Sequence, residues 1–285
     1  ESGFDSLWCH DHLIPSDPGR NEGTCFEAWA LLGAYAMMTK NITIGPMVSG
    51  NTYRNPVLLA KSATTVDMMS NGRLIFGIGA GWFEKEHIAY GFPFYSTRER
   101  IDRMEESIDL IKTLWTSDRP VNFSGKYYSL DNAPFDPKPF QTPHPPILIA
   151  GGGEKHTLRV VARWADMMNV YGTPELASRK YRILESHCKD IGRDPKHIEK
   201  SVNVALIPPE KMADWDDYIK TLKITMPSQA QAKIDGAVVG NMDNIRDWIR
   251  GHAEAGTQHI IFTMRAPYPL DSLRTLAKTI VPQFK

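Results

Sequence analysis

The chain has 285 residues, and its 33 lysines and arginines balance 33 aspartates and glutamates, so the formal net charge is zero. This balance excludes the basic surface that nucleic acid or an anionic membrane would require. The sequence contains no apolar run long enough to span a bilayer and no secretory signal. Its three cysteines are too few and too scattered for a disulfide framework or a zinc site. We therefore expect a cytoplasmic protein that acts on a small molecule.

Short apolar segments recur along the chain without strict alternation of apolar and polar residues. This pattern is typical of parallel strands that are buried on both faces. The seven predicted strands are Phe4–Cys9, Ile42–Val48, Leu74–Ala80, Ile147–Ala150, Met167–Tyr171, Val202–Ile207 and His259–Met264.

Helical patterns separate these strands. Thr24 with Glu27 fits a capping box, Ser96 with Glu99 fits a second one, and Asn71-Gly72 marks a helix end. The predicted helices cover residues 28–38, 56–69, 100–115, 154–165, 174–191, 242–255 and 272–280.

Strands that alternate with helices predict right-handed βαβ units, which build either a closed (β/α)₈ barrel or an open, doubly wound sheet. We favour an α/β fold of the TIM-barrel type, with a single domain over residues 1–285. A closed barrel needs eight strands and seven are predicted, so we expect a first strand and helix to precede the residues shown.

Two connections are long. Residues 116–146, inserted between barrel strands 4 and 5, predict a hairpin around Ser124-Gly125 followed by a proline-rich stretch. Long loops are often functional, but a rigid surface strap is equally consistent with this sequence. Residues 211–239 form a second, irregular and polar stretch that we expect to be a mobile lid.

Active sites of barrels lie at the carboxyl ends of the strands. His10, Asp11 and His12 follow the first strand shown, and a histidine beside a carboxylate can act as an acid or base near neutral pH. Metal ligation needs further ligands that the sequence does not indicate, and a histidine that only caps the loop is the other alternative.

The loop after the next strand contains Gly50 and Asn51, which allow a close approach of a ligand to the backbone. Arg54 in the same loop would pair with an anion or, more commonly, with a nearby carboxylate.

Gly77 and Gly79 do not begin a dinucleotide fingerprint, because Trp82 stands where its third glycine would be. These glycines make room for a planar ring with Trp82 beside it, or they relieve crowding inside the barrel.

The segment Gly151–Gly153 joins a strand to a helix that contains Thr157 in its first turn. Free N–H groups at a helix start form an anion site, and glycines leave it open. Because the G-x-G-x-x-G spacing is missing here too, a single phosphate fits better than a pyrophosphate.

Five segments in this order resemble the bacterial luciferase-like monooxygenase family, particularly its deazaflavin-dependent branch. They are "GFDSLWCHDHLIP", "GPMVSGNTYRNPVLLAK", "GRLIFGIGAGWFEKEHIAYGFPF", "RERIDRMEESIDLIKTLW" and "PILIAGGGEKHTLRVVARWADMMNV". The resemblance implies a TIM barrel that binds coenzyme F420, or alternatively FMN, and that forms a homodimer.

The resemblance also implies roles for individual residues. His12 would donate or accept a proton beside the redox ring, with Asp11 orienting it. A non-proline cis peptide bond would join Met47 and Val48. The residues implied to bind the cofactor are Met47, Val48, Gly50, Asn51, Gly81, Trp82, Gly151, Gly152, Gly153 and Thr157, and no metal is implied.

Trp82 is a departure, because some F420-dependent dehydrogenases carry an acidic residue after the glycine that matches Gly81. Glu84 and Glu86 are the possible substitutes, but we do not expect either to take this role. The departure therefore counts against dehydrogenation of an alcohol or sugar phosphate, and it leaves reduction of an activated double bond or a flavin-type monooxygenation. The function we expect is hydride transfer between F420 and a small organic substrate. The alternatives are an FMN-dependent monooxygenase with a separate reductase, a non-catalytic flavin-binding homologue and, least favoured, a metal-dependent hydrolase.

Overall fold

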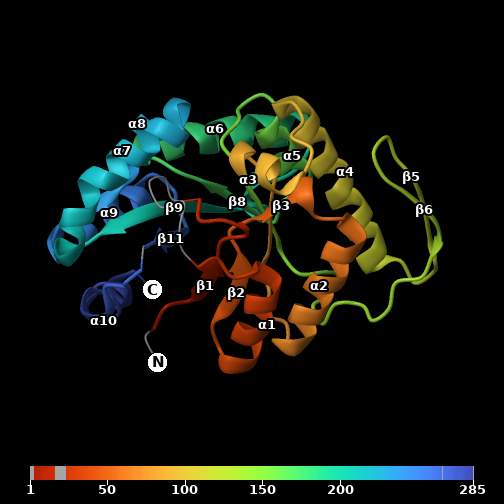
Figure 1. The fold of residues 1–285 in the computed structure, drawn as a ribbon, viewed down its shortest axis with the longest axis horizontal. Coiled ribbons are helices and arrows are strands. Elements are labelled where there is room, and N and C mark those ends of the chain that lie inside the picture. The colour runs from red at the N-terminus through yellow and green to blue at the C-terminus, as the bar shows by residue number, and fades with distance from the viewer. Residues whose placement is uncertain (1–2, 17–23, 265, 285) are drawn as a thin grey trace.

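A parallel β-sheet surrounded by helices forms the centre of the molecule (Figure 1). The computed structural model describes residues 3–16, 24–264 and 266–284. The strands are β1 Ser6–Cys9, β2 Thr43–Pro46, β3 Ser49–Gly50, β4 Phe76–Gly79, β5 Val121–Ser124, β6 Ser129–Ala133, β7 Ile147–Ala150, β8 Met167–Val170, β9 Glu199–Ile207, β10 Val238–Val239 and β11 His259–Thr263. All seven predicted strands are present.

The helices lie between these strands. The α-helices are α1 Ala28–Met38, α2 Pro56–Met69, α3 Glu84–Tyr90, α4 Thr97–Thr116, α5 Thr157–Trp164, α6 Pro174–Asp190, α7 Trp215–Thr225, α8 Pro227–Gly236, α9 Met242–Glu254 and α10 Leu270–Thr279. Short 3₁₀ helices are η1 Asn51–Tyr53, η2 Pro195–His197, η3 Pro209–Asp214 and η4 Val281–Gln283.

The main sheet pairs its strands in parallel in the order β3-β4-β7-β8-β9, and both β10 and β11 pair with β9. Strands β1 and β2 form a separate parallel pair, and an isolated bridge between Ile44 of β2 and Leu74, just before β4, links this pair to the main sheet. Among the described residues, β1 and β11 share no backbone pairing. Their side chains nevertheless meet, since Ser6 Oγ lies 2.7 Å from His259 Nε2. The two end strands are therefore close, as a barrel requires, without closing the ladder themselves.

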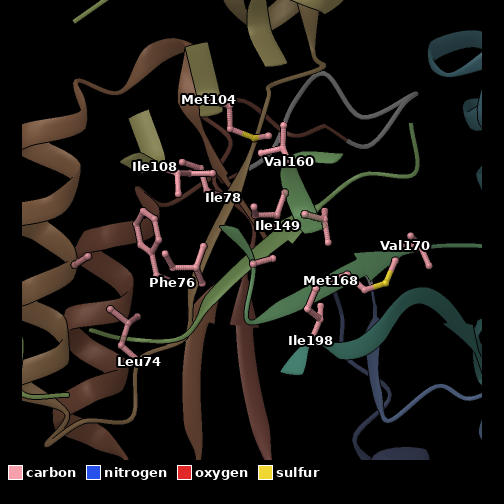
Figure 2. Close-up of a cluster of buried hydrophobic side chains, with 14 of the residues drawn as sticks. Leu74, Phe76, Ile78, Met104, Ile108, Ile149, Val160, Met168, Val170 and Ile198 are labelled. Carbon is pink, nitrogen blue, oxygen red and sulfur yellow. The ribbon is translucent and has the colours of Figure 1, made fainter. Parts of the chain in front are cut away.

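Each central strand buries both faces. Ile147 and Ile149 of β7 belong to the large core between strands and helices, whereas Leu148 belongs to a smaller inner cluster with Met47 and Met167. Figure 2 shows the large core, where side chains of β4, β7 and β8 pack against α4 and α5. Burial on both faces explains why the strand sequences do not alternate.

The 116–146 insertion contains the predicted hairpin, β5 and β6, which lies outside α4 (Figure 1). The proline-rich stretch is anchored to α2. Gln141 donates from its backbone N and its Nε2 to the buried carboxylate of Asp67, over 2.9 and 2.7 Å. Phe135 inserts into the core with 5% of its surface exposed. These contacts fix the proline-rich stretch to the core of the protein, which agrees with the interpretation as a rigid surface strap.

Two local predictions need correction. Residues 211–239 are largely helical rather than irregular, because η3, α7 and α8 occupy most of them. The α1 cap is Glu27 alone: its carboxylate accepts the Ala30 N–H over 2.7 Å, so Thr24 is not the capping residue. In the second predicted capping box only the Ser96 half is confirmed: Ser96 Oγ accepts the Glu99 N–H over 3.3 Å, whereas the Glu99 side chain pairs with Arg103.

Candidate cofactor and active site

The loops that follow β1, β3 and β4 meet at one edge of the sheet. The Gly50 N–H donates to the carboxylate of Asp11 over 3.2 Å, and His12 lies against Glu86. Because β7 is parallel to β4 and paired with it, the glycine turn after β7 lies at the same edge. The structure thus gathers the predicted site residues at the carboxyl ends of the strands.

Asp11 is tied to Arg54. Its carboxylate, with 2% of the residue exposed, accepts Arg54 Nε at 2.6 Å and Nη2 at 2.5 Å. The same Nη2 reaches Glu27 at 2.5 Å, and the Tyr53 hydroxyl donates to the Asp11 carbonyl. Burial lowers the pKa of Arg54, but hydrogen bonds with Asp11 and Glu27 and their charges bring it above its ordinary value. The described residues record no hydrogen bond between Asp11 and His12, and the orienting role of Asp11 stays a prediction.

Glu86 holds His12 instead. His12 Nδ1 lies 3.2 Å from Glu86 Oε1, and the histidine side chain is 15% exposed. The imidazole packs edge-on against Trp82 and Phe83, each with 5.7 Å between ring centroids. The ring of His10 lies 6.3 Å away. The structure thus places both Trp82 and Glu86 beside His12.

Glu84 and Glu86 were the two possible substitutes for the missing acidic residue. Glu84, at the start of α3, is exposed, whereas Glu86 is buried. Because they are two residues apart in one helix, their side chains must lie on different faces of that helix. Which one faces His12 depends on how α3 packs, so the sequence did not distinguish them.

The Met47–Val48 peptide bond is cis, as predicted. The absence of side chains at two nearby glycines leaves space for this segment. A Cβ at Gly79 would lie 2.7 Å from Val48 Cγ2, and one at Gly77 would lie 3.0 Å from Val48 Cγ1. A Cβ at Gly77 would also collide with the Pro46 carbonyl oxygen. These glycines therefore make room for Pro46 and Val48, which favours crowding over the planar-ring interpretation.

Asn51 is buried in the next part of this loop, with 2% exposure. Its Nδ2 donates to the Tyr128 hydroxyl over 3.4 Å, and its Oδ1 has no hydrogen-bond partner among the described residues. Gly81 has a φ of 73°, and a Cβ there would collide with the side chain of Thr52. Glycine at this position is thus required by backbone conformation and by close packing.

The glycine turn is shaped around Thr157. Gly151 has a φ of 138° and donates its N–H to the Asn169 carbonyl over 3.0 Å. A Cβ at Gly153 would lie 2.7 Å from Thr157 Oγ1. Within the described part of the chain, the N–H groups of residues 152–157 have no recorded acceptor. A run of unpaired N–H groups at the start of α5 is an arrangement that binds anions.

Two lysines that the sequence analysis did not single out lie at the strand ends. Lys180 of α6 pairs with Glu154 over 2.7 Å, and a Cβ at Gly152 would lie 3.5 Å from its Cε. Lys233 of α8 lies over the ring of Tyr171, which follows β8, with 4.4 Å from Nζ to the centroid. Burial lowers the pKa of Lys233 to about 8. The two lysines come from different helices, and only the packing of these helices brings them to the strand ends. No local sequence motif therefore indicates them as site residues.

Residues 3–16, 24–264 and 266–284 contain no group of three or more His, Cys, Asp or Glu arranged to hold a metal ion. In the same ranges, no helix has the length and apolar character needed to cross a membrane.

A family model described as luciferase-like monooxygenase matches residues 1–259. An F420-dependent glucose-6-phosphate dehydrogenase from Amycolatopsis mediterranei is 41% identical over 168 residues, covering 58% of this chain and 47% of that protein. A phthiodiolone/phenolphthiodiolone dimycocerosates ketoreductase from Mycobacterium tuberculosis is 28% identical over 255 residues, covering 81% of this chain and 66% of the relative. The chain thus spans about half the length of the first relative and 66% of the second.

Among solved structures, an F420-dependent secondary alcohol dehydrogenase in complex with an F420-acetone adduct superimposes with a TM-score of 0.86. The match covers 100% of this chain and 91% of that one, at 22% identity. This likeness confirms the predicted α/β barrel-type fold.

Proposed function

Because the chain belongs to the luciferase-like monooxygenase family, we propose that it is an oxidoreductase that transfers a hydride between coenzyme F420 and a small organic substrate. The observation that carries this proposal is the convergence of three features at one edge of the sheet: the glycine turn, the Met47–Val48 loop and His12. When bound, the coenzyme would supply the hydride chemistry, while the protein supplies binding, orientation and proton transfer.

The glycine turn fits a phosphate group of the coenzyme. The unpaired N–H groups of residues 152–157 provide donors, and the Thr157 hydroxyl lies within the same turn. A side chain at Gly153 would fill the space beside that hydroxyl. The turn thus has the donors and the open space that a single phosphate needs.

His12 is the proposed proton donor or acceptor. It lies at the end of β1 beside Trp82, whose side chain is partly exposed. We propose that Trp82 walls the substrate pocket and limits access of water. Lys233 and the helices of residues 211–239 lie across the ends of neighbouring strands and are the proposed lid.

The choice of F420 over FMN rests on the relatives. The phosphate turn suits both coenzymes, but the dehydrogenase with 41% identity is named for F420. The names of the relatives support three substrate classes: a sugar phosphate from the glucose-6-phosphate dehydrogenase, a carbonyl compound from the ketoreductase, and an alcohol from the secondary alcohol dehydrogenase. We leave FMN, with a separate reductase, as the alternative outcome of the test.

Parallel equilibrium titrations with oxidised F420 and FMN, followed by fluorescence, test this proposal. We expect F420 to bind with a dissociation constant at least about ten-fold lower, a difference of about 1.4 kcal/mol. Tighter binding of FMN would contradict the proposal and support the monooxygenase alternative. Failure to bind either coenzyme would support a non-catalytic role.

A matched pair of glycine variants tests the phosphate turn. Gly153→Ala introduces a Cβ 2.7 Å from Thr157 Oγ1, whereas Gly33→Ala in α1 meets only Met69 Cε at 3.9 Å. We expect Gly153→Ala to weaken coenzyme binding at least about ten-fold and Gly33→Ala to leave it unchanged. Equal affinities in both variants would show that the phosphate binds elsewhere.

A further inference from the structure

Glu86 is a fully buried carboxylate whose two oxygens have different partners. Oε2 accepts the backbone N–H groups of Leu13 at 2.5 Å and Ile14 at 3.4 Å. Oε1 faces His12 Nδ1 at 3.2 Å. One carboxylate on α3 thus fixes both the loop that carries His12 and the imidazole ring itself.

The charge of Glu86 is set by these contacts. Burial alone would raise the pKa of its carboxyl, but hydrogen bonds from His12, Leu13 and Ile14 and the charge of His12 bring it below its ordinary value. An ionised carboxylate only accepts hydrogen bonds, so His12 Nδ1 must be the donor. In the neutral imidazole, the lone pair is then on Nε2.

The aromatic neighbours hold this orientation. Trp82 and Phe83 contact the imidazole edge-on, at interplanar angles of 82° and 88°. Rotating the ring to exchange its nitrogens would break the contact with Glu86 inside a packed environment. For Nε2, the described residues record no hydrogen-bond partner, so this nitrogen is available to a substrate.

We propose that Glu86 is the positioning residue that keeps the His12 proton on Nδ1 and presents Nε2 as the proton acceptor for substrate oxidation. This rests on the proposed function. An alcohol substrate would lose a hydride, with two electrons, to the oxidised coenzyme, and its hydroxyl proton to Nε2. The carboxylate of Glu86 stabilises the resulting imidazolium, which returns the proton in the reverse direction. Glu86 thus supplies the carboxylate that is absent at position 82, through the histidine rather than by contact with substrate.

The tautomer of His12 can be measured directly by ¹⁵N NMR on protein labelled in its nine histidines, with and without coenzyme. The His12→Gln spectrum assigns the resonance. We expect the neutral wild-type ring to carry its proton on Nδ1. A neutral ring protonated mainly on Nε2 would overturn the proposal, even if no Glu86 variant folds.

Glu86→Gln provides the second measurement, with Glu84→Gln on the exposed side of the same helix as its control. The glutamine can still accept from Leu13, but its amide donates to His12 Nδ1, so the proton should move to Nε2. We expect kcat to fall on the order of 10²–10⁴-fold, with KM and coenzyme affinity changed less than about three-fold.

The control should keep the wild-type tautomer and kcat. A Glu86→Gln variant with unchanged tautomer or unchanged kcat would overturn the proposal. Parallel loss of coenzyme affinity and kcat would indicate a structural role and also overturn it. The tautomer measurement without coenzyme does not depend on which coenzyme binds, so failure of the proposed function in the titrations remains distinguishable.

Discussion

The pair formed by Asp11 and Arg54 predicts a large stability effect for Asp11→Asn. The aspartate is 2% exposed and the arginine side chain 18% exposed, so removing the negative charge leaves a largely buried guanidinium. Breaking a buried ion pair from one side costs about 3–5 kcal/mol. Arg54 keeps its contact with Glu27, whose side chain is 44% exposed, so we expect the lower end, about 3 kcal/mol.

Urea unfolding at neutral pH, followed by circular dichroism and tryptophan fluorescence, measures this change. The midpoint should fall while the slope stays constant. Asp271→Asn is the matched control, because Asp271 pairs with Arg274 at 2.9 Å with both side chains exposed, and we expect no measurable change.

A loss smaller than about 1 kcal/mol in Asp11→Asn would refute the reasoning, since it would mean that solvent or Glu27 fully compensates for the lost partner. Normal stability together with a collapse of kcat would instead restore Asp11 to the catalytic role first expected from the sequence.

Two further predictions concern regions outside the site. Burial lowers the pKa of His252 from 6.5 to about 4. As the pH falls, the unfolded chain therefore binds this proton before the folded protein does. The contribution of the neutral ring to the free energy of unfolding should be fully present above about pH 6.5 and should decrease by about 3 kcal/mol towards pH 4. Urea unfolding over this range should show a flatter profile for His252→Gln, and an identical profile would contradict the assignment. Glu106 accepts the N–H groups of Lys126, Tyr127 and Tyr128 over 2.7 to 2.9 Å, so Glu106→Ala should accelerate hydrogen exchange in the hairpin about ten-fold while β7 keeps its wild-type rates. Unchanged exchange in the hairpin would show that Glu106 does not hold it.

The strands could be predicted because each carries its own signal. Ile147 and Ile149 face the helices and Leu148 faces the barrel interior, so every residue of β7 up to Ile149 must be apolar. The helices of residues 211–239 lack such a signal. Most of their side chains are exposed or half-buried, and only a few positions, such as Leu222 and Ala230, enter the core.

The position of the site could be predicted from the rule for strand ends, but its internal contacts could not. Asp11 and Arg54 are 43 residues apart, and His12 and Glu86 are 74 apart. A carboxylate next to a histidine in the sequence suggested a pair, yet on an extended segment neighbouring side chains point to opposite faces. Asp11 therefore faces Arg54, and the carboxylate that reaches His12 comes from helix α3.

The two buried carboxylates differ in what their partners allow. Arginine stays protonated throughout the pH range in which proteins fold, so Arg54 cannot exchange a proton and its pair with Asp11 serves to hold the loops together. An imidazole ring can accept a proton on one nitrogen while the other donates a hydrogen bond, so the Glu86–His12 pair can take up a proton during a reaction. A residue that moves a proton needs a fixed position and a partner that stabilises its charged form. Asp11 and Arg54 hold the loops together, whereas Glu86 holds the ring of His12 and stabilises its positive charge. Loss of Asp11 should therefore appear in stability and loss of Glu86 in turnover.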